Sequence, residues 1–462
     1  MSEEKSARRE RLFYSQKHGY DLISDAERAD CDAYCEGYKR FLDAARTERE
    51  AVKAAVALAE AEGFVPYVRG MALRPGLRIY QNNRGKTLSL AVIGEKSLAE
   101  GAVITAAHID APRLDLKPNP LYEDSELAYF KTHYYGGIRK YQWAAIPLEL
   151  HGAVALRGGE TLDVCIGADE NDPAFVITDL LPHLAADQNK KTLGEAITGE
   201  NLNLLIGSIP DQEEGADRVK LRVLSILNEK YGVTEEDFLS AELEVVPSLP
   251  TRDIGLDRSL LGGYGHDDRV CSYAALKALL DTPHPGRTAV CVLADKEEIG
   301  SYGSSGMGSE FFENFMADLC RTQNVELRHC FEKSFCFSSD VCNAFDPNFP
   351  EVSEKRNNAR LNYGVSVVKY TGSRGKGGAN DANAETLGYL RKVFAAHGVV
   401  WQSGELGKVD QGGGGTVATE LACRNIETVD AGVPVLAMHS PYEVVAKFDC
   451  YMTYKAMKAI AL

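Results

Sequence analysis

Apolar residues recur at helical spacing through the first sixty positions of the chain. From about Asp25 to Glu62 the sequence is rich in Ala, Glu, Arg and Lys, and apolar residues such as Phe41 and Val52 fall on one face of a helix. Gly63 is a normal helix stop. The pattern predicts a helical stretch from Asp25 that ends at Gly63.

The pattern then changes to short apolar runs, which predict strands at 88–94 and 102–108. After Asp267 helices and strands alternate regularly, with helices expected at 270–281 and 311–322 and strands at 288–294 and 334–339. Strands separated by helices indicate an α/β fold with a doubly wound, mainly parallel sheet whose two faces are both covered.

The middle third of the chain has a different pattern of apolar and charged residues. Residues 151–167 resemble a β-hairpin, residues 237–244 predict a helix, and the connections are rich in charged residues. We therefore expect an inserted β-rich lobe at 121–246. It interrupts one catalytic domain built from residues 1–120 and 247–462.

Composition excludes several classes of protein. The 462 residues carry 51 Lys plus Arg against 67 Asp plus Glu, a net charge of −16, which argues against nucleic acid or anionic membranes as partners. The eleven cysteines are scattered and no CxxC pair occurs, which is typical of a reducing cytoplasm. The N-terminus has no apolar signal-peptide core and no run of about 18 apolar residues occurs, so we expect a cytoplasmic protein.

Several polar residues stand directly after apolar strands, where open α/β sheets bind their ligands. Each alone could be a cap or a solvated side chain. Together they are better explained as a cluster gathered at one edge of the sheet, with Asp267 and its neighbour Asp268 added just before a helix. The residues after strands are His108, Asp110, Glu297, Glu298, Asp340 and His439.

Imidazole and carboxylate groups without thiolate suit zinc, manganese or cobalt in a hydrolytic site. A carboxylate shared by two cations suits a two-metal centre that activates a bridging water and polarises a carbonyl. In the pair Glu297 and Glu298, one carboxylate can coordinate a metal while the other takes the proton.

The chain resembles the aspartyl aminopeptidase-like family of co-catalytic zinc aminopeptidases. The resemblance spans nearly the whole chain, through AAHIDAPRLDLKP, YYGG, LLPHLA, NLNLLIGSIP, DDRVCSYAALKAL, ADKEEIGS, SSDVCNAFDPNF and AGVPVLAMHS in the family's order. The resemblance implies two divalent metal ions per subunit. Zinc is the expected metal, and cobalt and manganese are alternatives.

The resemblance also implies a role for each residue. His108 and Asp340 would hold one metal, Glu298 and His439 the other, and Asp267 would bridge them. Glu297 would be the general base. Asp110 would orient the imidazole of His108.

The family's inserted lobe forms dimers, which assemble into a homododecamer. By resemblance, His183 would reach from one subunit into its neighbour's cleft and support the substrate carbonyl. Lys369, in a glycine-rich segment at 369–385, would face the substrate. The expected activity is removal of N-terminal residues from peptides, with an acidic first residue as one option.

Other functions remain open at this stage. A deacylase or carboxypeptidase acting on N-acyl amino acids could use the same ligands, and a non-catalytic assembly protein could keep the fold. The presence of Glu297 beside five metal ligands favours an enzyme. The glycines at 412–415 lack a P-loop ending, so they form either a turn into a helix or a loop lining the substrate cleft. No Gly-x-Ser-x-Gly motif occurs, which argues against a serine nucleophile.

Overall fold

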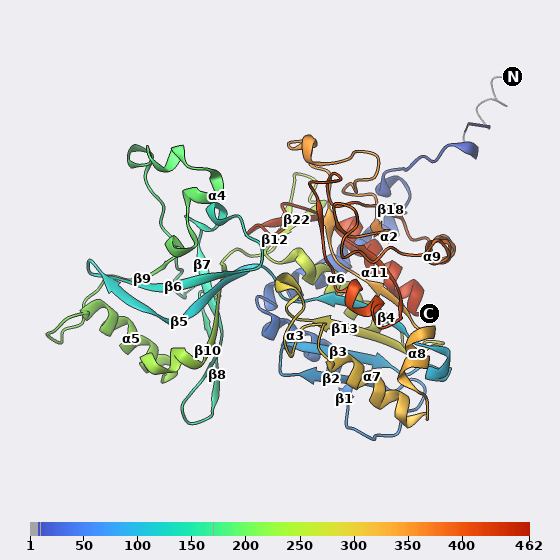
Figure 1. The fold of residues 1–462 in the computed structure, drawn as a ribbon, viewed down its shortest axis with the longest axis horizontal. Helices are drawn as coiled ribbons and strands as arrows, with labels where there is room; N and C mark the ends of the chain where they lie inside the picture. The colour runs from blue at the N-terminus through green and yellow to red at the C-terminus, as the bar shows by residue number, and fades with distance from the viewer. Residues whose placement is uncertain (1–7, 10, 170) are drawn as a thin grey trace.

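The computed structural model describes residues 8, 9, 11–169 and 171–462. Figure 1 shows a larger body of helices and sheet beside a smaller lobe dominated by strands. Segments from both ends of the chain form the body, whereas the cyan to green middle of the chain forms the lobe. The predicted α/β class is confirmed. Within the described residues, no helix is both long and apolar enough to cross a membrane.

A nine-stranded sheet runs through the body. Its four central strands, β13, β4, β14 and β20, are parallel, and β3 and β16 flank them as antiparallel neighbours. In spatial order the strands are β1 (Val65–Pro66), β2 (Arg78–Asn83), β3 (Thr87–Val92), β13 (Ala289–Ala294), β4 (Val103–His108), β14 (Phe335–Ser338), β20 (Glu427–Gly432), β16 (Val365–Val368) and β18 (Trp401–Ser403).

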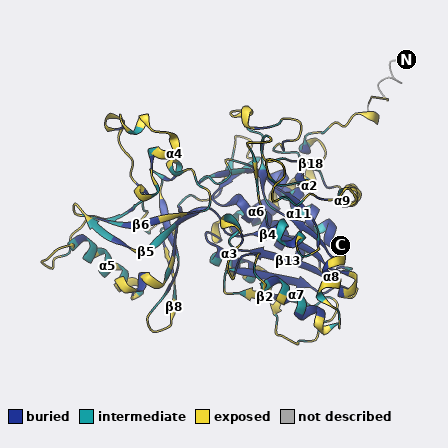
Figure 2. Cartoon of the chain, viewed as in Figure 1, coloured by how far each residue is buried: buried dark blue, intermediate teal, exposed yellow. Residues whose placement is uncertain are grey.

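Helices cover both faces of this sheet. Side chains along a strand point alternately to opposite faces, so one strand can contribute to two hydrophobic cores. In β13, Cys291 and Leu293 enter one hydrophobic core while Val290 and Val292 enter the other. The first core includes residues of α2 (Asp25–Ala44), α3 (Glu48–Ala61), α6 (His266–Leu280), α9 (Ala384–His397) and α11 (Lys447–Ala461). The second includes residues of α7 (Phe311–Thr322), α8 (Leu327–Lys333) and α10 (Ala418–Ala422). Figure 2 shows the central strands as buried.

The predicted single helical stretch from Asp25 to Glu62 is wrong at one point, because the structure divides it into α2 and α3. Thr47 begins the second helix. Its backbone N–H donates to the Glu50 carboxylate and its hydroxyl oxygen accepts from the backbone N–H of Glu50, which is a capping box.

The lobe is an antiparallel six-stranded sheet with its own hydrophobic core. The predicted hairpin is present as β7 and β8. In spatial order the strands are β8 (Thr161–Ile166), β7 (Leu148–Ala155), β10 (Ala241–Pro247), β5 (Arg113–Asp124), β6 (Leu127–Tyr135) and β9 (Leu204–Gly207), and the lobe also holds α4 (Leu193–Ala196) and α5 (Arg218–Tyr231).

The helix predicted at 237–244 is wrong. A 3₁₀ turn at Glu235–Ser240 leads directly into strand β10. Leu243 and Val245 alternate into the core of the lobe, and pairing with β7 and β5 supplies backbone hydrogen bonds that a helix would have made internally.

Two smaller sheets lie near the strand ends of the body. One has the spatial order β11 (Arg252–Ile254), β12 (Leu260–Gly263), β22 (Glu443–Ala446), β21 (Pro434–Leu436) and β15 (Cys342–Asn343). The other pairs β17 (Gly372–Ser373) with β19 (Gly413–Gly414).

Candidate metal centre

Three neighbouring parallel strands end at the candidate site. His108 is the last residue of β4, Asp340 follows β14, and Glu297 and Glu298 lie in a 3₁₀ turn just after β13. Because β13, β4 and β14 are adjacent and parallel, their carboxyl ends meet at one edge of the sheet. The sequence reasoning placed these residues together for this reason.

Asp267 lies in the first turn of α6, between the two histidines. Its Oδ1 is 3.3 Å from Nε2 of His108, and its Oδ2 is 3.1 Å from Nε2 of His439. Around it, Asp340 Oδ1 lies 3.9 Å from His108 Nε2 and Glu298 Oε1 lies 3.4 Å from His439 Nε2. One carboxylate therefore faces two imidazoles, as a bridging ligand would.

These residues form three groups with a geometry suited to metal binding, one of which joins His108 with Glu297 and Glu298, and the other two contain Asp267. In the group His108, Asp267 and Asp340, and in the group Asp267, Glu298 and His439, the potential ligand atoms lie within 4.8 Å of one another. Asp267 belongs to both groups. The neighbouring Asp268 instead accepts the backbone N–H of His108 at 3.3 Å.

The charges of the cluster favour added cations. Asp267 Oδ1 and Glu298 Oε1 are buried without a hydrogen-bond partner among the described residues. Burial raises the pKa of Glu298 and of Asp340 well above the usual carboxylate range. Burial alone would lower the pKa of His439, but the hydrogen bond to Asp267 and the charge of Glu298 raise it to about 10. The donor set therefore fits divalent cations, which would neutralise these carboxylates.

Asp110 organises the side of the cluster next to His108. Nδ1 of His108 lies 3.0 Å from the backbone carbonyl oxygen of Asp110 and 3.2 Å from its Oδ1, so this residue fixes the ring with Nε2 facing Asp267. The same carboxylate accepts the backbone N–H groups of Glu297 and Glu298 at 3.1 and 3.2 Å. One buried residue thus positions a histidine through its backbone and side chain, and both members of the glutamate pair through its side chain.

A second polar residue, Glu443, was not singled out by the sequence reasoning. Its buried carboxylate accepts the backbone N–H groups of Asp267 at 3.0 Å and of His439 at 2.7 Å. It therefore fixes the backbone positions of two of the expected ligands relative to each other. Glu443 follows His439 closely, and proximity to that histidine was the signal available in the sequence.

The lobe also contacts the cluster, through the turn after β6. The hydroxyl of Tyr135 donates to Oδ2 of Asp110 at 2.8 Å, and the carbonyl oxygen of Gly137 lies 2.8 Å from Nδ1 of His439. These residues belong to the YYGG motif, whose contacts the sequence reasoning did not predict.

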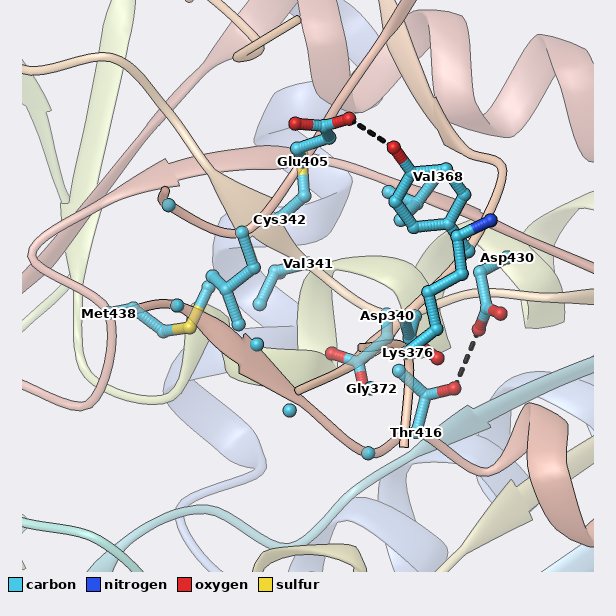
Figure 3. A pocket seen from close by; sticks show the side chains of 18 of the residues that line it. Asp340, Val341, Cys342, Val368, Gly372, Lys376, Glu405, Thr416, Asp430 and Met438 are labelled. Carbon is cyan, nitrogen blue, oxygen red and sulfur yellow. Dashed lines mark hydrogen bonds between the residues drawn. The ribbon is translucent and has the colours of Figure 1, made fainter. Parts of the chain in front are cut away.

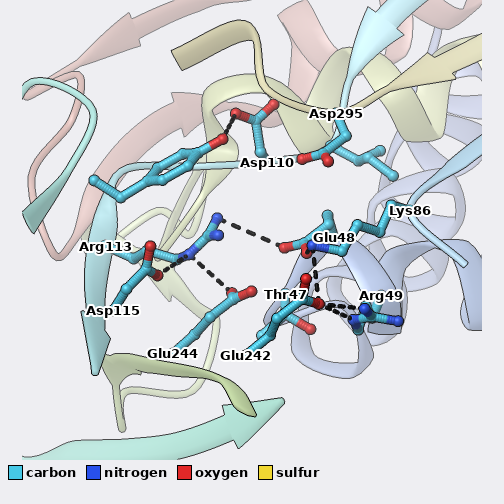
Figure 4. A network of polar contacts seen from close by, with 12 residues as sticks. Thr47, Glu48, Arg49, Lys86, Asp110, Arg113, Asp115, Glu242, Glu244 and Asp295 are labelled. Carbon is cyan, nitrogen blue, oxygen red and sulfur yellow. Dashed lines mark hydrogen bonds and ion pairs between the residues drawn. The ribbon is translucent and has the colours of Figure 1, made fainter. Parts of the chain in front are cut away.

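Charged residues connect this turn to the rest of the lobe. The guanidinium of Arg113 lies 3.9 Å from the centre of the Tyr135 ring. It also forms ion pairs with Asp115 at 2.8 Å, Glu244 at 3.1 Å and Glu48 at 3.6 Å (Figure 4). Because Glu48 belongs to α3, this network joins lobe and body beside Asp110.

A cleft of about 400 Å³ opens over the cluster. Its lining includes Asp267, Glu297 and Glu298 together with Gly412–Gly415, so the glycines do border the cleft. Figure 3 shows apolar side chains, including Val341, Val368 and Met438, on the walls of the cleft. Two cationic residues of the glycine-rich segment, Arg374 and Lys376, also line the cleft.

The two residues expected to bind substrate lie outside this cleft. Lys369 lines a neighbouring cavity of about 470 Å³ and pairs with Asp381, which also accepts Lys376 at 2.9 Å. His183 lies in an exposed 3₁₀ turn of the lobe, Pro182–Leu184, next to the exposed Leu181 and Leu184. Within this single chain the structure does not bring His183 to the metal centre.

Comparison with known proteins identifies the family. The profile described as aminopeptidase I zinc metalloprotease (M18) matches residues 41–460. A protein of Clostridium acetobutylicum named probable M18 family aminopeptidase 1 is 47% identical over 457 residues, covering 97% of this chain and 98% of that protein. The crystal structure of an M18 family aminopeptidase from Thermotoga maritima superimposes with a TM-score of 0.93 at 42% identity, covering 97% of this chain and 99% of that one.

A more distant neighbour shows that the fold occurs in large assemblies. The structure titled as the mApe1 dodecamer of Saccharomyces cerevisiae has a TM-score of 0.75 at 20% identity, covering 93% of this chain and 96% of its own. The closer matches favour aminopeptidase activity over deacylase or purely structural roles. The chain belongs to the M18 family of zinc metalloproteases and is an aminopeptidase.

Proposed function

We propose that the chain binds two divalent cations, with zinc as the favoured metal and Asp267 as the bridging ligand. His108 and Asp340 hold one cation, and Glu298 and His439 hold the other. The observation that carries this assignment is that the two carboxylate oxygens of Asp267 face different imidazoles, at 3.3 and 3.1 Å. When bound, such a pair polarises a peptide carbonyl and lowers the pKa of a water between the cations.

Glu297 is the general base in this proposal. Its carboxylate lies beside the cluster, with Oε2 3.8 Å from Nε2 of His108, but it belongs to neither group that contains Asp267. Burial, reinforced by the charges of Asp110 and Asp267, raises its pKa to about 7, which suits proton transfer near neutral pH. Glu297 accepts a proton from the attacking water and gives it to the amine nitrogen as the peptide C–N bond breaks.

The substrate is a peptide with a free amino terminus, and we extend the proposal to acidic first residues. An acidic side chain in the cleft would lie near Arg374 and Lys376. Lys369 lies outside the cleft and would help to position Lys376, because both lysines pair with the carboxylate of Asp381.

The inserted lobe, which the sequence places at residues 121–246 and whose sheet runs from Arg113 in β5 to Pro247 in β10, forms the dimer. Exposed leucines at 180, 181 and 184 flank His183 and offer an apolar surface for a second subunit. His183 then reaches the partner's cleft, and the dimers assemble into a homododecamer. All eleven cysteines are free, which supports a cytoplasmic location.

A substrate panel tests the activity and the base together. Purified protein with added zinc, cobalt or manganese should release arylamine from aminoacyl-arylamides with a free amino group and leave N-acetyl amino acids intact. Glu297→Gln should retain its metals and lose about 100-fold or more in turnover. Glu332→Gln, an exposed change on α8, is the matched control. Loss of both metals in Glu297→Gln, or near-normal turnover, contradicts the assigned base.

A further inference from the structure

A second group of metal-ligand residues lies where helix α3 of the body meets the lobe sheet. Glu50, His151 and Cys165 offer ligand atoms within 4.8 Å of one another. His151 is on β7 and Cys165 on β8, and the two residues are direct cross-strand partners. Side chains paired in this way emerge on the same face of a sheet. This group shares no residue with the catalytic cluster.

The carboxylate of Glu50 is fixed in place by the start of its own helix. Its Oε2 accepts from the backbone and the hydroxyl of Thr47 at 3.1 and 3.2 Å, which leaves Oε1 directed at Nδ1 of His151, 2.8 Å away. The histidine is 2% exposed, so its ring is held by packing. Two potential ligands, from body and lobe, are therefore already oriented toward one point.

The other ring nitrogen of His151 faces a carboxylate of its own strand. Glu149 Oε1 lies 3.2 Å from Nε2, and Arg46 Nε lies 3.3 Å from the same oxygen. Both Nε2 and this oxygen are buried without a hydrogen-bond partner among the described residues. Metal-binding histidines commonly donate their second N–H to a carboxylate, and a small rotation of the ring would complete that bond.

We propose that Glu50, His151 and Cys165 form a structural site for a zinc-type divalent cation that ties α3 to the lobe. Zinc accepts carboxylate, imidazole and thiolate at about 2.0–2.3 Å, and three protein ligands leave a fourth position for water. Cys165 is exposed, which gives the ion a path from solvent.

A plain ion pair is the competing explanation of these contacts. Burial lowers the pKa of His151, but neighbouring Cys165, Glu149 and Glu50 outweigh this effect and raise it to about 12, so the metal-free ring is protonated. In such an ion pair Cys165 takes part only as a hydrogen-bonding thiol beside the two carboxylates. A metal site instead binds it as a thiolate. Metal binding would displace the proton and would strengthen as pH rises.

Cobalt distinguishes the two explanations, because a thiolate bound to Co²⁺ gives a near-ultraviolet charge-transfer band and the catalytic cluster contains no thiol. Full-length protein is stripped with a chelator and titrated with Co²⁺ at mildly alkaline pH. The wild type should show the band and bind about one more equivalent of metal than Cys165→Ser. Cys423→Ser, which removes the other exposed cysteine, should keep both.

The site is overturned by the absence of a thiolate band in the wild type, by a band that persists in Cys165→Ser, or by equal metal content in the two proteins. The melting temperature of each metal-free variant verifies folding. Added zinc should raise the melting temperature of the wild type more than that of Cys165→Ser, since a ligand bound only to the folded state stabilises it. An equal rise also contradicts the proposal.

Discussion

Removing the hydroxyl of Tyr135 tests whether the lobe supports the catalytic cluster. In Tyr135→Phe the ring stays in contact with Arg113, so packing and the cation–π contact remain. What disappears is the 2.8 Å hydrogen bond to Asp110, the residue that orients His108 and accepts the backbone N–H groups of Glu297 and Glu298. The change is therefore directed at the positions of reacting groups.

The size of the effect follows from the nature of that bond. A hydrogen bond to a charged group contributes about 1.5–3 kcal/mol, and about 1.4 kcal/mol corresponds to a factor of ten. Asp110 keeps its other contacts, so only part of this energy is lost at the cluster. We expect kcat to fall about 10-fold to 100-fold, the range found for residues that orient metal ligands, and zinc affinity to weaken. KM should change little because Tyr135 does not line the cleft.

The matched control is Tyr129→Phe. Tyr129 lies earlier on β6 and stacks on Tyr122, so the same atom is removed from the same strand without touching Asp110. Steady-state kinetics with an aminoacyl-arylamide and competition for zinc with a chelating dye give kcat, KM and metal affinity for both variants. If Tyr135→Phe matches Tyr129→Phe in kcat and zinc affinity, the hydrogen bond to Asp110 does not position the cluster.

Three further outcomes follow from the site. Asp267→Ala should lose both ions, since the bridging carboxylate offsets their mutual repulsion, whereas His439→Ala should lose mainly one; two tightly held ions in Asp267→Ala would move the bridge to Asp268. Chelation should abolish activity, and restored zinc should recover it, unless the reaction needs no metal. Dimers mixed from inactive His183→Ala and Glu297→Gln chains should recover part of the activity, and mixed dimers of confirmed mass without recovery would reject a shared cleft.

The sequence was informative about the cluster because its geometry follows from strand order. His108 ends one buried parallel strand, Asp340 and the glutamate pair follow two others within a few residues, and parallel strands present those positions at one edge. Asp267 needed more than this rule, because it precedes a helix, where an N-cap is the ordinary explanation. The family resemblance supplied its expected role, and the structure places it between the two histidines.

Elements of the lobe were harder to predict, because tertiary pairing decides them. Residues 237–244 have acidic and leucine residues compatible with a helix, yet Leu243 and Val245 alternate toward the core and neighbouring strands satisfy the backbone. The break between α2 and α3 at Thr47 has a local cause rather than a tertiary one. Its capping box is a local signal, but helical apolar periodicity continues on both sides of it.

The turn after β6 brings the lobe into contact with the candidate metal centre of the body. Nδ1 of His439 lies 2.8 Å from the carbonyl of Gly137, and Nδ1 of His108 faces Asp110, which Tyr135 holds. One turn therefore supports the outer nitrogens of both imidazoles, while their inner nitrogens face Asp267. The lobe thereby adds contacts that orient the two imidazoles, which the body brings near one another.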